Sequence, residues 1–211
     1  MFTGIITARG HIARLEQRGD ARVTIACPFD PAKIAIGASI ACSGVCLTVI
    51  DRGGERLPDG GFDAWFTVDV SGETIAHTAP SQWHVGREIN LEGALKLGDE
   101  LGGHIVTGHV DAVGHVVGVC PEGDSHRLGI AAPKALAPYI AAKGSVTVDG
   151  VSLTVNEVTD QPDGTAHFAL NIIPHTAHVT TLGALVPGDA VNLEIDVLAR
   201  YLKRMQALQA G

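Results

Sequence analysis

The stretch Gly44-Val45-Cys46-Leu47-Thr48-Val49 occurs a second time in the chain as Gly150-Val151-Ser152-Leu153-Thr154-Val155. The two copies differ only at the third position, where a cysteine in the first copy corresponds to a serine in the second. They lie 106 residues apart (150 minus 44) in a chain of 211 residues. A match of this length, repeated at half the chain length, is typical of an internal duplication.

Two further pairs of segments repeat on either side of this stretch. Residues 3–12 are similar to residues 107–116 at an offset of 104 (107 minus 3), and residues 86–92 are similar to residues 188–194 at an offset of 102 (188 minus 86). Chance similarity would not keep both order and spacing, and two copies are too few for a solenoid. The sequence therefore predicts two related domains, residues 1–97 and 98–196, followed by residues 197–211.

Each half contains short runs in which apolar and polar residues alternate. Residues 23–27, 66–70 and 191–195 alternate in this way, which is typical of strands with one face in a core and the other in water. Glycine-rich turns separate the runs, and residues 52–61 form one longer hairpin. About six short strands per hundred residues predict an all-β fold of two small closed barrels, because closure removes exposed strand edges.

Helical patterns are few. The segment after Asp196, a residue type that caps helix N-termini, places its apolar residues on one stripe. Such a terminal helix either packs on its own barrel or meets a copy of itself. A shorter helix is expected between Pro133 and Ala142, interrupted at Pro138. The terminal stripe comprises Val197, Leu198, Tyr201, Leu202, Met205 and Leu208.

Composition narrows the function classes. Hydrophobic residues make up 45% of the chain, and the formal net charge is −8. An acidic chain without a Lys/Arg cluster disfavours nucleic acid as a partner, because such binding normally rests on a basic surface. The N-terminus has no signal-peptide pattern, and no apolar run approaches the roughly 20 residues that span a bilayer. Four cysteines are few for a disulfide framework, so we expect a cytoplasmic protein with reduced thiols and no membrane partner.

The repeated stretch also carries the first candidate for chemistry. On a strand, Cys46 and Thr48 share one face, opposite the apolar residues between them. A free cysteine is usually a small buried hydrophobe. The second copy, however, has Ser152 at the same position, so both halves present a hydrogen-bonding side chain there. This correspondence favours a functional role for the face.

The second candidate is the segment Gly102–Asp111, which contains His104 and His109. On a strand, a spacing of five directs the two histidines to opposite faces, and no cysteine or carboxylate set completes a metal site. We therefore expect no metal. Gly108 lets a ligand approach the backbone closely. His109 is either a general base beside that ligand or a structural histidine in a turn and strand.

The third candidate is a pair of equivalent segments, Asp69–Thr74 and Asn171–Thr176. In each, a strand leads into glycine or proline and then threonine, which predicts a short helical turn. Such a turn either binds a polar ligand through its free N–H groups and hydroxyl or caps itself. The sequence contains neither a nucleotide-phosphate loop nor a nucleophile elbow.

Together these segments resemble the alpha-type riboflavin synthase family. The resemblance implies two similar six-stranded Greek-key barrels from a tandem duplication, with a C-terminal α-helix that supports a homotrimer. It also implies a site between the N-terminal barrel of one subunit and the C-terminal barrel of a neighbour. It runs from Met1 to about Arg204 and rests on Met1–Ile6, Gly44–Val49, Gly102–His109, Asp149–Val155 and Thr180–Gly183.

The resemblance implies a transferase reaction, the last step of riboflavin biosynthesis. Two molecules of 6,7-dimethyl-8-ribityllumazine exchange a four-carbon unit and yield riboflavin and 5-amino-6-ribitylamino-2,4-pyrimidinedione, without cofactor or metal. Two similar pockets that face each other suit two identical reactants, since orientation of this kind can supply about 7–11 kcal/mol. The resemblance leaves open an association with lumazine synthase.

Catalytic roles are carried over by the same resemblance. Cys46, with Ser39, polarises or adds to one lumazine, and His109 transfers a proton. Ser152 is the counterpart of Cys46, and Asp196 steadies the hydrogen bonds of the site.

Further residues are expected to bind substrate, and Phe2 is expected to hold the N-terminal segment against the pocket. In the C-terminal half, Thr154 and Thr176 are expected to orient the second lumazine. The N-terminal pocket is assigned Gly4, Ile5, Ile6, Leu47, Thr48, Asp69, Val70, Ser71, Gly72, Glu73 and Thr74. The C-terminal pocket is assigned Gly108, His109, Val110, Lys143, Ser152, Leu153, Thr154, Ile172, Ile173, Pro174, His175, Thr176 and Ala177.

Two positions depart from the family pattern. Ser71-Gly72 replaces an apolar pair and His175 replaces a glutamate, both on segments expected to line the pockets, where they bear on ligand affinity and pH dependence. Rival interpretations are a lumazine or flavin carrier without turnover, a structural barrel, and the flavin-binding barrel of an oxidoreductase. An oxidoreductase would need a nucleotide-binding α/β domain, which this chain lacks. Cys46 and His109 favour an enzyme over a carrier or a structural protein.

Overall fold

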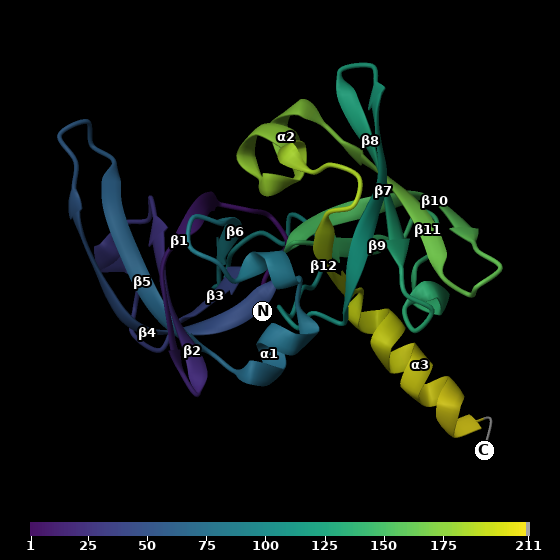
Figure 1. The fold of residues 1–211 in the computed structure, drawn as a ribbon, viewed down its shortest axis with the longest axis horizontal. Coiled ribbons are helices and arrows are strands. Elements are labelled where there is room, and N and C mark those ends of the chain that lie inside the picture. The colour runs from purple at the N-terminus through teal and green to yellow at the C-terminus, as the bar shows by residue number, and fades with distance from the viewer. Residues whose placement is uncertain (210–211) are drawn as a thin grey trace.

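The computed structural model describes residues 1–209 and consists of two β-barrels that lie side by side, with one helix at the C-terminal end (Figure 1). Each barrel is closed and contains six strands, and every strand pairs antiparallel with its neighbours. The first barrel runs from purple through blue to teal in Figure 1, and the second from teal through green to yellow. The predicted all-β fold with two similar barrels is confirmed.

Around the first barrel the strands follow the order β1-β2-β5-β4-β3-β6. The strands are β1 (Ala8–Arg18), β2 (Asp20–Cys27), β3 (Ser39–Cys42), β4 (Val45–Arg56), β5 (Phe62–Val70) and β6 (Glu88–Gly93). The helical segments are the helix α1 (Gly72–His77) and the 3-10 turns η1 (Pro31–Lys33) and η2 (Pro80–Gln82).

The second barrel repeats this order as β7-β8-β11-β10-β9-β12, so each strand takes the place of the strand numbered six lower. The strands are β7 (Ala112–Glu122), β8 (Ser125–Ala132), β9 (Ser145–Val148), β10 (Val151–Asp160), β11 (Ala166–Ile172) and β12 (Ala190–Ile195). The helical segments are η3 (Ala137–Tyr139), α2 (Pro174–Val179) and η4 (Thr181–Ala184), followed by α3 (Val197–Gln209). Identical strand order in two separate barrels confirms the duplication.

Each barrel has its own core, built mainly from valine, isoleucine and leucine. The alternation predicted for residues 23–27 is confirmed, since Val23, Ile25 and Cys27 are buried and the residues between them are half-buried. The expectation of a water-facing side is wrong for β12. Asn192 and Glu194 lie on its outer face and are nevertheless 2% exposed. Asn192 packs against the first barrel, where it contacts Ser43 and Gln82, and Glu194 is covered by the segment before β7, Thr107–His109.

The contact between the barrels is built from symmetry-related pairs. The side-chain amide of Asn90 on β6 donates to the Asp149 carbonyl at 2.9 Å, and that of Asn192 on β12 donates to the Ser43 carbonyl at 2.8 Å. Gly44 and Gly150, the first residues of the repeated stretch, face each other in turns with φ of +83° and +81°. A Cβ on Gly150 would lie 2.7 Å from the Gly44 nitrogen. Each of these glycines is therefore needed because the turn of the other barrel leaves no room for a side chain.

Turns and helices follow the sequence pattern with one exception. The hairpin predicted over residues 52–61 is confirmed: β4 extends to Arg56 and β5 begins at Phe62. The helix expected between Pro133 and Ala142 is reduced to the 3-10 turn η3. Pro138 explains this, because proline lacks the N–H that a helix interior needs and its ring clashes with the preceding turn.

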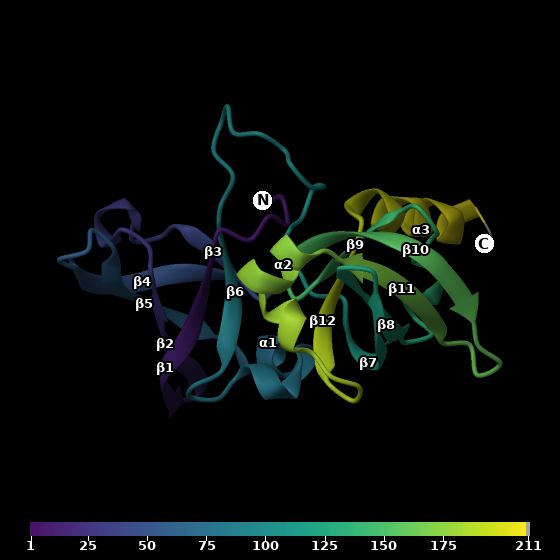
Figure 2. The same cartoon turned by 90° about the horizontal axis from the view of Figure 1, so that it is seen from above.

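The C-terminal helix α3 begins after Asp196, as predicted, and the Asp196 carboxylate accepts the Leu198 N–H at 2.9 Å. Most of the apolar stripe of α3 is exposed, and Figure 2 shows the helix at the C-terminal end beside the second barrel. Leu198, Tyr201, Leu202, Met205 and Leu208 are 58–68% exposed in the single chain. Among residues 1–209, the structure contains no helix long and apolar enough to cross a membrane.

Candidate active site

A cavity of about 450 Å³ opens where β4, α1 and the segment before β7 come together. It brings the Cys46 side chain of β4 near His109, although these residues are 63 positions apart in the sequence (109 minus 46). The complete lining is Val45, Cys46, Ser71, Glu73, Thr74, His77, Thr78, Gly108, His109 and Val110. The two candidate regions of the first barrel and the histidine segment thus meet in one cavity.

Gly108 makes the close contact that forms this cavity. Its carbonyl accepts the Cys46 N–H at 2.8 Å, and a Cβ on Gly108 would lie 2.6 Å from the Cys46 Cβ. The φ of Gly108 is +76°, a conformation that side chains other than glycine rarely adopt. Glycine is therefore needed here both for space and for backbone conformation. Cys46 itself is half-buried and His109 is exposed.

The segment before the first strand of each barrel, here called its leading segment, lies in this chain at the other barrel from the pocket to which the resemblance assigns it. Gly108, His109 and Val110 were expected in the C-terminal pocket, and they line the cavity of the first barrel. Gly4, Ile5 and Ile6 were expected in the N-terminal pocket, and they lie against the second barrel, where the Ser152 N–H donates to the Gly4 carbonyl at 2.8 Å. Each barrel thus lends the segment before its first strand to the other barrel.

Phe2 lies at the crossing point of these two segments. It forms a β-bridge with Val106, and its side chain is fully buried against Ala41 and Val106, with Cys46 beside them. The Phe2 side chain therefore packs in a small buried cluster that supports Cys46 on the side away from the cavity.

The turn after β5 is a helix that caps itself. The Ser71 hydroxyl accepts the Thr74 N–H at 3.1 Å, and Thr74, Glu73 and Ser71 still line the cavity. Asp69 and Val70, assigned to the pocket from the sequence, lie outside it. Val70 is buried in the core, and Gly72 is also absent from the lining.

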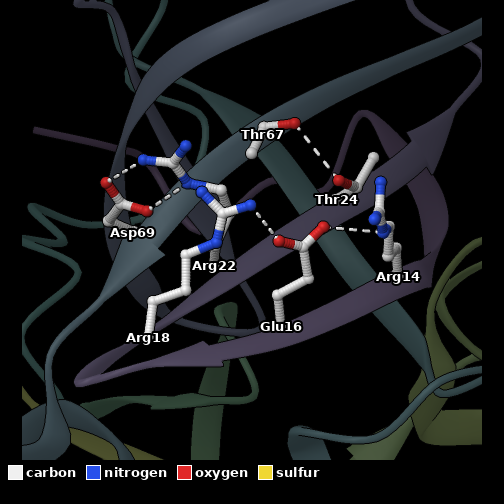
Figure 3. Close-up of polar contacts among 7 residues, drawn as sticks. All are labelled: Arg14, Glu16, Arg18, Arg22, Thr24, Thr67 and Asp69. Carbon is white, nitrogen blue, oxygen red and sulfur yellow. Dashed lines mark hydrogen bonds and ion pairs between the residues drawn. The ribbon is translucent and has the colours of Figure 1, made fainter.

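Asp69 faces the outer surface of the first barrel (Figure 3). Its carboxylate accepts two hydrogen bonds from the Arg22 guanidinium, at 2.8 and 3.0 Å. The hydrogen bond and charge of Arg22 hold the pKa of Asp69 below its usual value. On the same surface, Glu16 pairs with Arg14 and with Arg18 (Figure 3). Asp69 is therefore part of a surface ion-pair group on β1, β2 and β5.

A family model described as the lumazine binding domain matches the chain twice, over residues 3–94 and residues 107–196. A riboflavin synthase of Brucella abortus (strain 2308) is 48% identical over 99% of this chain and 100% of its own length. A riboflavin synthase of Bacillus subtilis (strain 168) is 34% identical over 97% of this chain and 89% of its own length. The chain belongs to the riboflavin synthase family.

Two solved structures that are similar to this chain are LumP complexes with a flavin or a lumazine. A crystal structure of LumP complexed with riboflavin has a TM-score of 0.75 and 26% identity, and covers 92% of this chain and 99% of that chain. LumP complexed with 6,7-dimethyl-8-(1'-D-ribityl) lumazine matches with a TM-score of 0.71 and 25% identity, over the same shares of both chains.

The second barrel of this riboflavin synthase family member presents a different polar arrangement. The Ser152 hydroxyl lies 2.7 Å from His104 Nδ1, and the Thr147 hydroxyl lies 3.2 Å from His104 Nε2. Burial lowers the pKa of His104, which is 8% exposed. His104 is not among the site residues that the sequence predicts. Its counterpart in the first half would precede Met1, so the repeat could not reveal it.

A smaller cavity of about 320 Å³ lies beside α2. His175 and His178 of α2 line it together with Ile6 and Arg9. The cavity corresponds in part to the one beside α1, with His175 in the place of Glu73 and Ile6 in the place of Val110, but Ser152 does not line it. The exchange of leading segments therefore recurs here, because Ile6 comes from the chain that precedes the first barrel.

Ser39 is separate from the Cys46 cavity. It pairs with Thr48 between β3 and β4 and lines another cavity, of about 650 Å³, together with Lys33 and Lys96. Leu47 is buried in the first core, and Asp196 caps α3.

The remaining residues assigned to the C-terminal pocket are spread over the second barrel. Ile172 is buried in its core, and Leu153 and Ala177 pack against that core. Thr154, Ile173, Pro174 and His175 are exposed, and Thr176 is half-buried. Lys143 is exposed in a turn with φ of +67°, where its N–H donates to the Val155 carbonyl at 2.7 Å.

Within the part of the chain that the structure describes, no group of three or more His, Cys, Asp or Glu side chains is placed to hold a metal ion.

Proposed function

We propose that this protein is a riboflavin synthase, which converts two molecules of 6,7-dimethyl-8-ribityllumazine into riboflavin and 5-amino-6-ribitylamino-2,4-pyrimidinedione. The observation that carries the proposal is the full-length similarity to relatives named riboflavin synthase, at 34–48% identity. Two cavities beside equivalent helices support it, because the reaction needs two lumazines.

The two sites divide the chemistry between them in this proposal. Cys46 polarises or adds to the lumazine in the first barrel, and His109, in the same cavity, transfers a proton. The Ser152 hydroxyl, held by His104, contacts the second lumazine, which Thr154 and Thr176 orient. The four-carbon unit leaves one lumazine ring and joins the other. Holding both rings in place is the main contribution of the protein, since orientation alone can supply about 7–11 kcal/mol.

Ser39, Lys143 and Asp196 remain in the proposed machinery only if a second subunit completes the site. In one chain Ser39 lines a different cavity from Cys46, although its pairing with Thr48 places it on the same face of β4. The exposed apolar stripe of α3 supports association between subunits, because a face of this kind is normally covered. We therefore propose a homotrimer that acts in the cytoplasm without a cofactor. An association with lumazine synthase stays a prediction, which co-elution of the two purified proteins would test.

The test is direct. Purified protein is mixed with 6,7-dimethyl-8-ribityllumazine, and riboflavin formation is followed by its absorbance. We expect riboflavin and the pyrimidinedione in equal amounts, with two lumazines consumed for each riboflavin. Tight binding of the lumazine with no riboflavin formed would instead identify a carrier, the alternative that similarity to LumP favours.

A further inference from the structure

Glu194 on β12 holds the segment that enters the site of the other barrel. One carboxylate oxygen, Oε1, accepts the Thr107 N–H at 2.7 Å and the Thr107 hydroxyl at 2.6 Å. The other oxygen, Oε2, accepts the N–H groups of Gly108 at 3.0 Å and His109 at 3.2 Å. One side chain thus fixes three consecutive residues. Glu194 is 2% exposed and is absent from the cavity lining.

The residues held by Glu194 are those that contact Cys46. Gly108 receives the Cys46 N–H, and His109 lines the same cavity. Glu194 belongs to the second barrel and Cys46 to the first. Loss of the Glu194 carboxylate in the second barrel would therefore displace Thr107–His109. That displacement would alter the Cys46 site in the first barrel.

The first barrel contains the mirror arrangement. Glu92 on β6 is 4% exposed, and its carboxylate accepts the N–H and hydroxyl of Thr3, both at 2.7 Å, and the Gly4 N–H at 2.9 Å. The Gly4 carbonyl in turn receives the Ser152 N–H at 2.8 Å. Glu92 thus holds the segment that contacts Ser152, just as Glu194 holds the segment that contacts Cys46.

A carboxylate suits these positions because it only accepts hydrogen bonds, and every partner is a donor. Burial raises the pKa of both glutamates, and the hydrogen bonds from the segments oppose that rise. Glutamine has nearly the same shape but one acceptor oxygen, and its NH₂ group would face N–H donors. A substitution by glutamine therefore removes the clamp while nearly conserving volume.

We propose that Glu194 and Glu92 are positioning residues with crossed targets. Glu194 sets the geometry of the Cys46 site in the first barrel, and Glu92 sets that of the Ser152 site in the second. The inference rests on the proposed function only for the identity of the ligand.

The experiment uses the Cys46 thiol of the full-length protein as a probe of one site. Iodoacetamide labelling of Cys46 is followed by peptide mass spectrometry, with and without 6,7-dimethyl-8-ribityllumazine. The variants are E194Q, E92Q and the control E157Q, whose carboxylate is exposed and pairs with Arg127 at 2.5 Å. Peptide resolution separates Cys46 from the exposed Cys120.

We expect E194Q to increase the labelling rate of Cys46 without ligand at least fivefold and to remove protection by the lumazine. E92Q and E157Q are expected to stay within twofold of the unchanged protein. Equal rates in E92Q and E194Q, or an unchanged rate in E194Q, would overturn the inference. Because Glu194 accepts four hydrogen bonds and Glu92 accepts three of the same kind, a general loss of stability would affect both variants to a similar extent.

A milder pair covers the case in which E194Q does not fold. Thr107→Val removes only the hydroxyl bond to Glu194, and Thr3→Val removes the matching bond to Glu92. The first is expected to raise Cys46 labelling at least twofold and the second to leave it unchanged; any other order contradicts the inference. If the lumazine protects Cys46 in no variant, the proposed function fails while the rates without ligand still decide the positioning roles.

Discussion

Cys46 and Ser152 occupy the same position of the repeat and have different surroundings. The Cys46 thiol is half-buried at a cavity that also contains the exposed His109. The Ser152 hydroxyl lies 2.7 Å from the buried His104. The shared backbone contact to a glycine carbonyl places both side chains, and the histidine at each site then differs in burial. The first site therefore presents an accessible thiol, and the second presents a hydroxyl in contact with a buried histidine.

Replacement of the thiol tests this difference. We expect Cys46→Ser to lower the rate of riboflavin formation by at least about tenfold, because a hydroxyl is a much weaker nucleophile than a thiol at neutral pH. The rate is measured by absorbance at saturating lumazine. Cys120→Ser, at an exposed position far from the cavity lining, is the control and should be fully active. Full turnover by Cys46→Ser would exclude the proposed role of the thiol.

Gly108→Ala places a methyl group 2.6 Å from the Cys46 Cβ in a backbone with φ of +76°. Gly123→Ala has a similar φ of +61°, but its Cβ meets no described atom within 4 Å. Both variants carry the backbone strain, so their difference isolates the clash. We expect Gly108→Ala to be less stable than Gly123→Ala by about 1–3 kcal/mol in urea denaturation, and to lose activity. Equal stability of the two would show that the segment moves freely.

Asp149 predicts a pH dependence of stability. Burial raises the pKa of Asp149 to about 7, although its carboxylate accepts the Asn192 N–H at 2.8 Å. The corresponding residue of the first half is Ser43, with a similar φ of +45° against +46°. Because the folded-state pKa is raised, protonation favours the folded state, and this contribution is lost as pH rises towards 7.

The unchanged protein should therefore lose about 2 kcal/mol relative to Asp149→Ser between pH 5 and pH 7. Urea denaturation of both proteins at several pH values measures the difference. A gap between the two proteins that does not change with pH would contradict the burial argument.

At the scale of elements, local patterns predicted strands and turns well. The alternation in residues 23–27 and the cap at Asp196 describe interactions among near neighbours, so the sequence carries them directly. The helix expected before β9 does not form, because Pro138 ends the helical hydrogen bonding and leaves only a 3-10 turn. The buried outer face of β12 also escaped prediction, since Asn192 and Glu194 are polar and their burial comes from distant contacts, with the other barrel for Asn192 and with the segment before β7 for Glu194.

The exchange of leading segments could not be predicted from the repeat. Thr3-Gly4 and Thr107-Gly108 are identical dipeptides, so an assignment to either barrel satisfies the same local contacts. Only the placement of Gly4 beside Ser152 and of Gly108 beside Cys46 decides between them. Candidate residues were thus found more readily than the cavity to which each one belongs.

The helix α3 carries a prediction at this scale. Leu202→Asp adds a charge to the exposed apolar stripe, whereas Arg204→Gln changes a residue off the stripe. We expect Leu202→Asp to dissociate the assembly to monomers in light scattering after gel filtration, and to lower activity if the site is shared between subunits. Arg204→Gln should behave as the unchanged protein. A monomeric unchanged protein with full activity would contradict the trimer.

At the scale of the whole molecule, the two barrels are held together by reciprocal polar contacts. Asn90 also accepts the Thr181 N–H at 2.8 Å, and Asn192 accepts the Ala79 N–H at 2.7 Å. All these groups are buried, so loss of one partner leaves others without a hydrogen bond. Removal of either asparagine should therefore weaken the whole contact between the barrels.

We expect Asn90→Ala and Asn192→Ala each to reduce the free energy of unfolding by about 2–3 kcal/mol. The double variant should lose less than the sum, because both side chains support one contact. Chemical denaturation measures all three, with the exposed Asn171→Ala as the control. Strict additivity would indicate that the two asparagines act independently.

The crossed leading segments have a consequence for the history of the chain. Two separate copies of a single barrel could make these contacts with each other. Each copy would place its leading segment beside the residue of the other copy that corresponds to Cys46 or Ser152. Fusion of the two genes keeps the partners in a fixed one-to-one ratio. It also lets each copy accept mutations that the other does not share, which a self-paired ancestor could not do. Cysteine in one half and serine in the other are the kind of divergence that such a fusion permits.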